Sequence, residues 1–112
     1  MYQYNYYAFL YFKNSNLPKI FIDTSNVIKA KEVFTKATIN YVATQNCCVV
    51  ANVTCEYGSS GYVELKLNGE RLLRTTYQDR IYPFVLYLSK DDTLTIDANS
   101  TGDSFYTVYG LK

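Results

Sequence analysis

The sequence predicts an all-β protein of a single domain, an antiparallel β-sandwich of jelly-roll-like form with about eight short strands. Two observations predict this class. Apolar side chains recur at every second position through most of the chain, and clusters of turn-forming residues separate these stretches at intervals of roughly 8–12 residues. Length sets the number of domains, because 112 residues suffice for only one hydrophobic core, so residues 1–112 are expected to form one domain.

Residues 1–13 form an aromatic segment whose side chains alternate on both faces of an expected strand. Tyrosine is enriched in strands and also where proteins meet, so the thirteen tyrosines fit either a β-rich body with wet faces or a contact surface. Strand addition joins such a segment to a neighbour's sheet edge through main-chain hydrogen bonds. We therefore predict a strand-exchange or docking arm at residues 1–13, and the residues expected to contact the partner are Tyr2, Tyr4, Tyr6, Phe9 and Tyr11.

The stretch up to residue 46 carries weaker signals. A short strand is expected at residues 19–23, followed by a turn at residues 24–26. Residues 27–36 leave two alternatives open, a strand or irregular segment and a single short helix, because their apolar spacing is partly helical. The β pattern returns at residues 38–43, and residues 44–46 turn the chain.

The second half of the chain has the clearest pattern. The strand that starts at Cys47 is expected to bury its odd-numbered side chains, and residues 58–61 form a flexible hairpin tip. Asn68-Gly69 suits a two-residue hairpin turn, because both of its positions take a positive φ. The remaining strands are expected at residues 62–67, 72–73, 82–88, 94–98 and 105–111, with turns at residues 89–92 and 99–103.

Few residues offer catalytic or metal-binding chemistry. The chain has no histidine, which excludes Ser-His-Asp and Cys-His catalysis. Cys47 and Cys55 lie on one expected strand, on the order of 26 Å apart, whereas a disulfide needs Cα atoms within about 7 Å. With Cys48 they are expected to be small buried thiols in a reducing compartment, and a metal or redox role is the alternative.

The acidic and basic residues also give no sign of a catalytic or metal site. Asp91-Asp92 is expected to form a turn rather than a calcium site, because aspartates in turns bond their own backbone. Arg71, Arg74 and Arg80 are expected to be solvated, with pairing to acidic groups of a neighbouring subunit as the alternative. We therefore predict no enzyme activity, no catalytic residue, no cofactor and no metal site.

Charge and hydropathy exclude two classes of partner. The formal net charge is +1 and no basic run occurs, which argues against nucleic acid. No apolar run approaches the roughly 20 residues that span a bilayer. The first residues lack the features of a secretion signal, so the chain is expected to be made and kept in a cytosol, or assembled from there.

The order of elements in residues 41–112 resembles the β-sandwich and jelly-roll domains of tailed-bacteriophage structural proteins. These include capsid decoration proteins, head-fibre and tail-fibre tips, and their relatives in the TNF/C1q-like superfamily. The corner where such domains usually have glycine reads Lys90-Asp91-Asp92 here. The segments that carry the resemblance are YVATQN (41–46), residues 47–53, YVELKLNGE (62–70), YPFVLYLSKDDTLTI (82–96) and YTVYGL (106–111).

The resemblance implies a component of the virion surface, made in the host cytoplasm, that forms a homo-oligomer and binds the capsid shell or projects from it. The leading hypothesis is accordingly an auxiliary (decoration) capsid protein or head-fibre subunit that binds other virion proteins. The rival hypothesis is a carbohydrate-binding β-sandwich that takes a host glycan. The residues that would stack on sugar faces in that case are Tyr62, Tyr77, Tyr82 or Tyr87.

Overall fold

The structure is a computed structural model, and it describes residues 21–55, 61–76 and 80–112. The described residues form six strands and no helix, and every strand pair is antiparallel. The all-β antiparallel class is therefore confirmed. The strands are β1 (Ile22–Val42), β2 (Cys47–Cys55), β3 (Tyr62–Leu67), β4 (Glu70–Thr75), β5 (Arg80–Leu88) and β6 (Thr93–Leu111).

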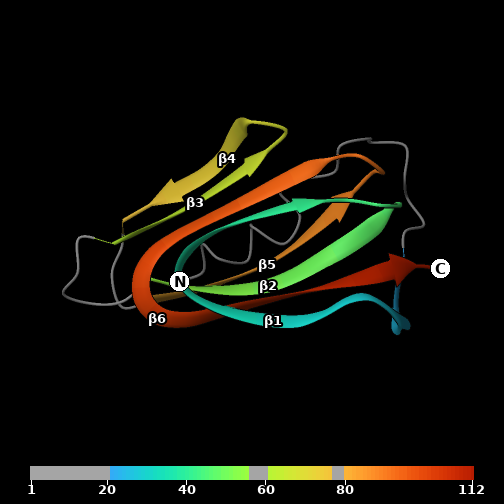
Figure 1. Cartoon of the computed structure of the whole chain (residues 1–112), viewed down its shortest axis with the longest axis horizontal. Helices are drawn as coiled ribbons and strands as arrows, with labels where there is room; N and C mark the ends of the chain where they lie inside the picture. Colours follow the sequence, from blue (N-terminus) through green and yellow to red (C-terminus); the bar gives the residue numbers. More distant parts are fainter. Residues whose placement is uncertain (1–20, 56–60, 77–79) are drawn as a thin grey trace.

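The described strands belong to one curled sheet. Its order is β4-β3-β6-β2-β5, and β1 pairs with the other edge of β6. The first half of β6 pairs with β3, and its second half pairs with β2. Figure 1 shows that β1 and β6 bend together, so that the two halves of the sheet enclose a common interior.

Strand β1 is longer than the sequence predicts, and two expectations about it are wrong. The expected turn at residues 24–26 lies inside β1, and residues 27–36 are strand, so the short-helix alternative is wrong. Asp23 does form the local turn, because its Oδ1 accepts hydrogen bonds from the Ser25 backbone N–H (3.1 Å) and hydroxyl (2.6 Å). Pairing with β6 resumes at Val27 after a register shift, so this turn is absorbed as an irregularity of the ladder.

Strand β6 likewise absorbs the turn that was expected at residues 99–103. Thr35 and Ala37 of β1 pair with Asp103 and Ala98 of β6, so residues 99–102 stand opposite Lys36 alone. Lys36 has a φ of 49°, in the left-handed region. The turn-forming residues therefore bend β6 without ending it. For the same reason the described part has two long strands where several short ones were expected.

The core follows the predicted alternation in β2. Its odd-numbered side chains, from Cys47 to Cys55, are all at most 2% exposed. Even-numbered side chains of β5 and β6 lie beside them on the same buried face, including Phe84 and Val108. Fully burying one such aliphatic or aromatic side chain is worth about 1.5–3 kcal/mol. The interior is therefore filled by alternate side chains of the curled sheet.

The three cysteines are free and buried, as predicted. Burial raises the pKa of Cys47 to about 11 and that of Cys48 to about 12. Cys48 lies outside the core cluster, and its ladder partners are Tyr87 of β5 and Tyr109 of β6. Burial also raises the pKa of Cys55, so all three thiols stay protonated near neutral pH.

Two predicted turns are confirmed. Asn68 and Gly69 have φ values of 52° and 84°, as a two-residue hairpin requires. The carboxylate of Asp92 accepts hydrogen bonds from the Ser89 backbone N–H (2.8 Å) and the Asn68 side-chain amide (3.0 Å). Asp92 therefore acts as a turn former, and it also ties the two turns together.

Candidate functional site: the β1 face

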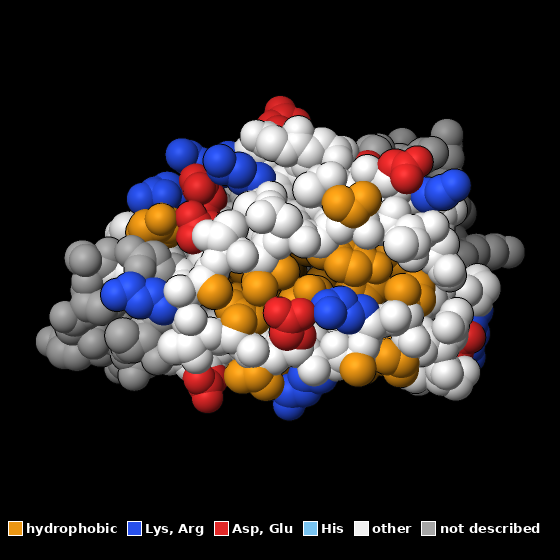
Figure 2. Space-filling model, in the orientation of Figure 1, with side chains coloured by type: hydrophobic (Ala, Val, Ile, Leu, Met, Phe, Trp, Pro, Cys, Tyr) orange, Lys and Arg blue, Asp and Glu red, His pale blue; other side chains and the backbone are white. Residues whose placement is uncertain are grey.

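The apolar interior reaches the surface between the two halves of β1, residues 22–35 and 37–42. Figure 2 shows hydrophobic side chains gathered there, with acidic and basic atoms lying among them. We call this surface the β1 face. The β1 side chains that pack against the core while staying only partly buried are Ile28, Ala37, Ile39 and Tyr41.

Tyr106 of β6 lies beneath the β1 face and joins its two halves. Its ring meets Phe34 of the first half edge-on at 6.2 Å between centroids, and Tyr41 of the second half at 6.3 Å. Such edge-to-face pairs add about 0.5–1.5 kcal/mol beyond the area that they bury. The Tyr106 hydroxyl donates to Glu32 Oε1 at 3.3 Å. Burial, followed by the charge of Glu32, raises the pKa of Tyr106 to about 12, so this donor keeps its proton.

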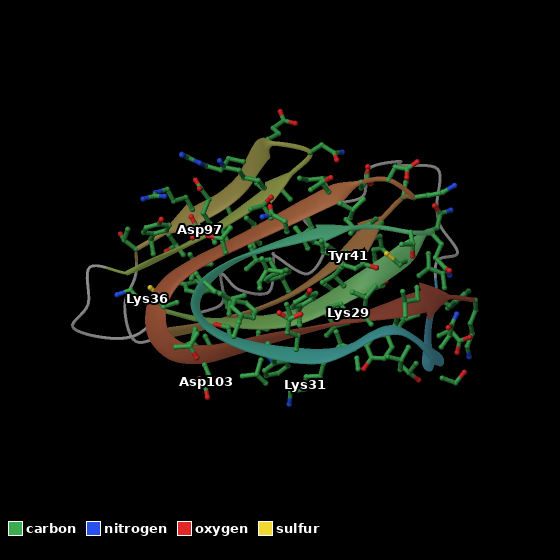
Figure 3. All side chains as sticks on the ribbon, in the orientation of Figure 1. Lys29, Lys31, Lys36, Tyr41, Asp97 and Asp103 are labelled. Carbon is green, nitrogen blue, oxygen red and sulfur yellow. The ribbon has the colours of Figure 1, made fainter. Side chains whose placement is uncertain are left out.

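One ion pair lies over this apolar surface. Lys29 Nζ is 3.1 Å from Glu32 Oε1 and 5.8 Å from the centroid of the Tyr106 ring. Figure 3 shows Lys29 between the two halves of β1, with Tyr41 on the opposite half. Both charged side chains are more than a third exposed, and pairs of this kind contribute about 0–1 kcal/mol. A partner could therefore displace this ion pair at little cost.

The edge of β1 that faces away from β6 pairs with no strand of the described part. Four register irregularities interrupt its pairing with β6 before Ala37, whereas pairing over residues 37–42 is unbroken. Bulges protect an exposed edge, and a regular edge accepts further strands. Exposed apolar side chains lie along the same strand, since Val27, Val33 and Val42 are at least 50% exposed.

The residues that the sequence singled out are only partly placed by the structure. The partner-contact residues of the expected arm, and Tyr77, lie outside the described residues. Tyr82 is 4% exposed and points into the core, so its expected role as a sugar platform is wrong. Tyr62 and Tyr87 are half-buried on the outer surface of the sheet.

Two of the arginines that were expected to be solvated, Arg71 and Arg74, form ion pairs with Glu64 of the same chain. Arg71 Nε lies 2.7 Å from Glu64 Oε2, and Arg74 Nη1 lies 3.6 Å from the same oxygen. The Arg80 side chain is outside the described residues. Sequence reasoning missed Glu64 because it sits on the outer face of β3, where the alternation predicts solvent.

Sequence reasoning also missed Phe34, Tyr41 and Tyr106. Their alternation was visible, but their meeting depends on the long-range pairing of β1 with β6. Among the described residues, no group of three or more His, Cys, Asp or Glu side chains could hold a metal ion. None of those residues forms a helix long and apolar enough to cross a membrane.

Comparisons with known proteins find no matching family model, no similar curated protein and no similar solved structure. The resemblance of residues 41–112 to phage structural domains therefore stays a prediction from the sequence.

Proposed function

We propose that this protein is a structural subunit that binds other proteins by strand addition at the β1 face. One observation carries the proposal: the partly exposed core and the regular open edge of β1 occur at the same place. A strand that pairs with residues 37–42 would gain main-chain hydrogen bonds there. Its alternate side chains would cover Ile39 and Tyr41.

The strand proposed to dock there is the arm of residues 1–13 from a neighbouring copy. Its alternating aromatic side chains suit an apolar surface that already contains Phe34, Tyr41 and Tyr106. Exchange of this arm between copies would produce a homo-oligomer. The contact residues of the arm remain those predicted from the sequence.

The setting proposed for this subunit is a virus particle, as an auxiliary (decoration) capsid protein or head-fibre subunit made in the host cytoplasm. The support is the pattern of residues 41–112, together with a described body made wholly of antiparallel strands. The jelly-roll-like sandwich belongs to the same proposal. Its partners would be other virion proteins.

The test combines an arm deletion with two matched surface variants. Deleting residues 1–13 should convert the oligomer to monomer in light scattering, while circular dichroism stays β-rich. Val42 is 54% exposed and lies within the edge that would accept the arm. Val42→Glu should weaken assembly, because it places a charge beside the docked apolar strand. Ile81→Glu is the control, because Ile81 is also more than half exposed (62%) but lies on β5. Normal assembly of the truncated protein, or equal effects of the two variants, would refute the proposal.

A further inference from the structure

A polar groove lies on the outer surface of the sheet, at the end where β1 and β6 curl. Its volume is about 440 Å³, within the range of roughly 300–1,000 Å³ that is usual for small-molecule sites. Figure 3 shows two of its residues, Lys36 and Asp97, at this end of the molecule. The lining residues are Lys36, Ala37, Thr38, Tyr62, Asp97 and Ala98.

Backbone strain coincides with this groove. Lys36 has a φ of 49°, which costs a side chain other than glycine about 1–2 kcal/mol. It stands alone opposite residues 99–102, where the two strands bend. Strained residues of this kind cluster at ligand sites, so the strain is a reason to ask what the groove binds.

The central acceptor of the groove is held in a fixed position. Asp97 Oδ1 accepts a hydrogen bond from the Thr38 hydroxyl, and Oδ2 accepts one from the Tyr62 hydroxyl, each at 3.1 Å. An ionised carboxylate has about four acceptor sites, so Asp97 keeps capacity for a ligand's hydroxyl groups. The hydroxyl oxygens of Thr38 and Tyr62 also retain acceptor capacity.

A row of side chains across the sheet supports this arrangement. The Arg74 guanidinium lies 4.1 Å from the centroid of the Tyr62 ring, and it also pairs with Glu64. The Glu64 side chain is only 8% exposed, and it pairs more closely with Arg71. Arg74, Glu64 and Asp97 are successive ladder partners across β4, β3 and β6. Such support holds the binding groups in place before a ligand arrives.

Lys36 supplies the remaining charge. It is exposed, and among the described residues its ammonium forms no ion pair. The groove therefore offers one fixed carboxylate, two hydroxyls and one unpaired cation. Hydroxyl groups of a ligand could bond the carboxylate and the two protein hydroxyls, and a negatively charged group could pair with the lysine ammonium.

We propose that this groove binds a saccharide that carries a carboxylate group. Asp97 accepts hydrogen bonds from the sugar hydroxyls, with Thr38 and Tyr62 beside it, and Lys36 faces the sugar carboxylate. The groove shares Ala37 and Thr38 with the edge of β1 that is proposed to accept a strand. Sugar binding and oligomer formation are measured separately, so either proposal can fail without the other.

The experiment follows backbone amide shifts of the full chain by NMR during titration with glucuronic acid, glucose and acetate. Glucuronic acid should give saturable shifts around Lys36, Tyr62 and Asp97, with roughly ten-fold tighter binding than glucose or acetate, as a charge-assisted hydrogen bond implies. Lys36→Met should reduce glucuronic acid binding to the level of glucose. Asp97→Asn should weaken binding of both sugars.

Two control variants keep the test falsifiable. Lys90→Met removes an exposed lysine in the turn between β5 and β6, and it should change nothing. Tyr62→Phe keeps the ring under Arg74 but removes the hydroxyl, so it should weaken binding while amide shift dispersion is preserved. Equal binding of acetate and glucuronic acid, shifts centred elsewhere, or no saturable shifts would each overturn the proposal.

Discussion

Replacing Ile96 by alanine should destabilise the protein more than any change on the outer face of the same strand. Ile96 is fully buried, and its ladder partners are Leu65 of β3 and Ile39 of β1. A buried isoleucine cut to alanine costs about 2–5 kcal/mol, because the lost transfer energy is joined by a cavity that relaxes incompletely. Because Ile96 has neighbours on both sides, we expect Ile96→Ala to lower the free energy of unfolding by about 3–4 kcal/mol.

Thr95→Ala is the matched control for this substitution. Thr95 is the preceding residue and lies on the outer face, where its hydroxyl donates to Asn40 Oδ1 at 2.9 Å. Loss of this exposed hydrogen bond should cost about 0.5 kcal/mol.

Urea unfolding followed by far-ultraviolet circular dichroism measures both values, and Ile96→Ala should also lower Tm by roughly 12–16 °C. A cost below about 1 kcal/mol for Ile96→Ala, or an equal cost for Thr95→Ala, would show that the assigned inner face of β6 is wrong.

Three further predictions concern the turns, the thiols and the buried carboxylate. Asn68→Ala should lower the free energy of unfolding in urea by about 2 kcal/mol, because it places alanine at a φ of 52° and removes two hydrogen bonds. Asn68→Gly loses only the hydrogen bonds and should cost about half as much, so equal costs would contradict this reasoning. Burial raises the pKa values of Cys47 (to about 11) and Cys48 (to about 12) above the ordinary 9.0, so their contribution to stability is complete below pH 9. The free energy of unfolding should therefore fall as pH rises from 9 to 12, and a flat profile would refute this. Glu64→Gln should cost about 1 kcal/mol at low salt and less at high salt, since Arg71 is 59% exposed and Arg74 is 39% exposed; a salt-independent cost would argue against an ionic origin.

The parts of the fold that the sequence predicted well depend on local chemistry. The small apolar residues of β2 occupy odd positions, so its inner face could be assigned without knowing its partners. Asn68-Gly69 carries its own backbone preference and formed the expected turn. In both cases the deciding residues are neighbours in the chain.

The expectations that failed depend on residues far apart in the chain. The turn signals at residues 24–26 and 99–103 act locally, but β1 and β6 stay paired on both sides of each one. The strands therefore bend at these residues and do not end there. In the last strand both faces are apolar, and only the fold shows that Tyr106 faces inward while Phe105 faces outward.

The candidate site was harder to predict for the same reason. The Tyr106 contacts with Phe34 and Tyr41, and the Glu64 pairing with Arg74, require a known register between distant strands. The sequence predicted a contact surface from its tyrosines but could not show where the open edge lies. That edge is a property of the curled sheet.

Hydrogen exchange of the backbone amides tests strand addition at the β1 face most directly. If an arm from a neighbouring copy pairs with β1, protection over residues 37–42 should rise with protein concentration and fall when residues 1–13 are deleted. Protection of β2 should change little, because it is paired on both sides by β5 and β6. Protection over residues 37–42 that is the same at every concentration, with and without the arm, would contradict the account.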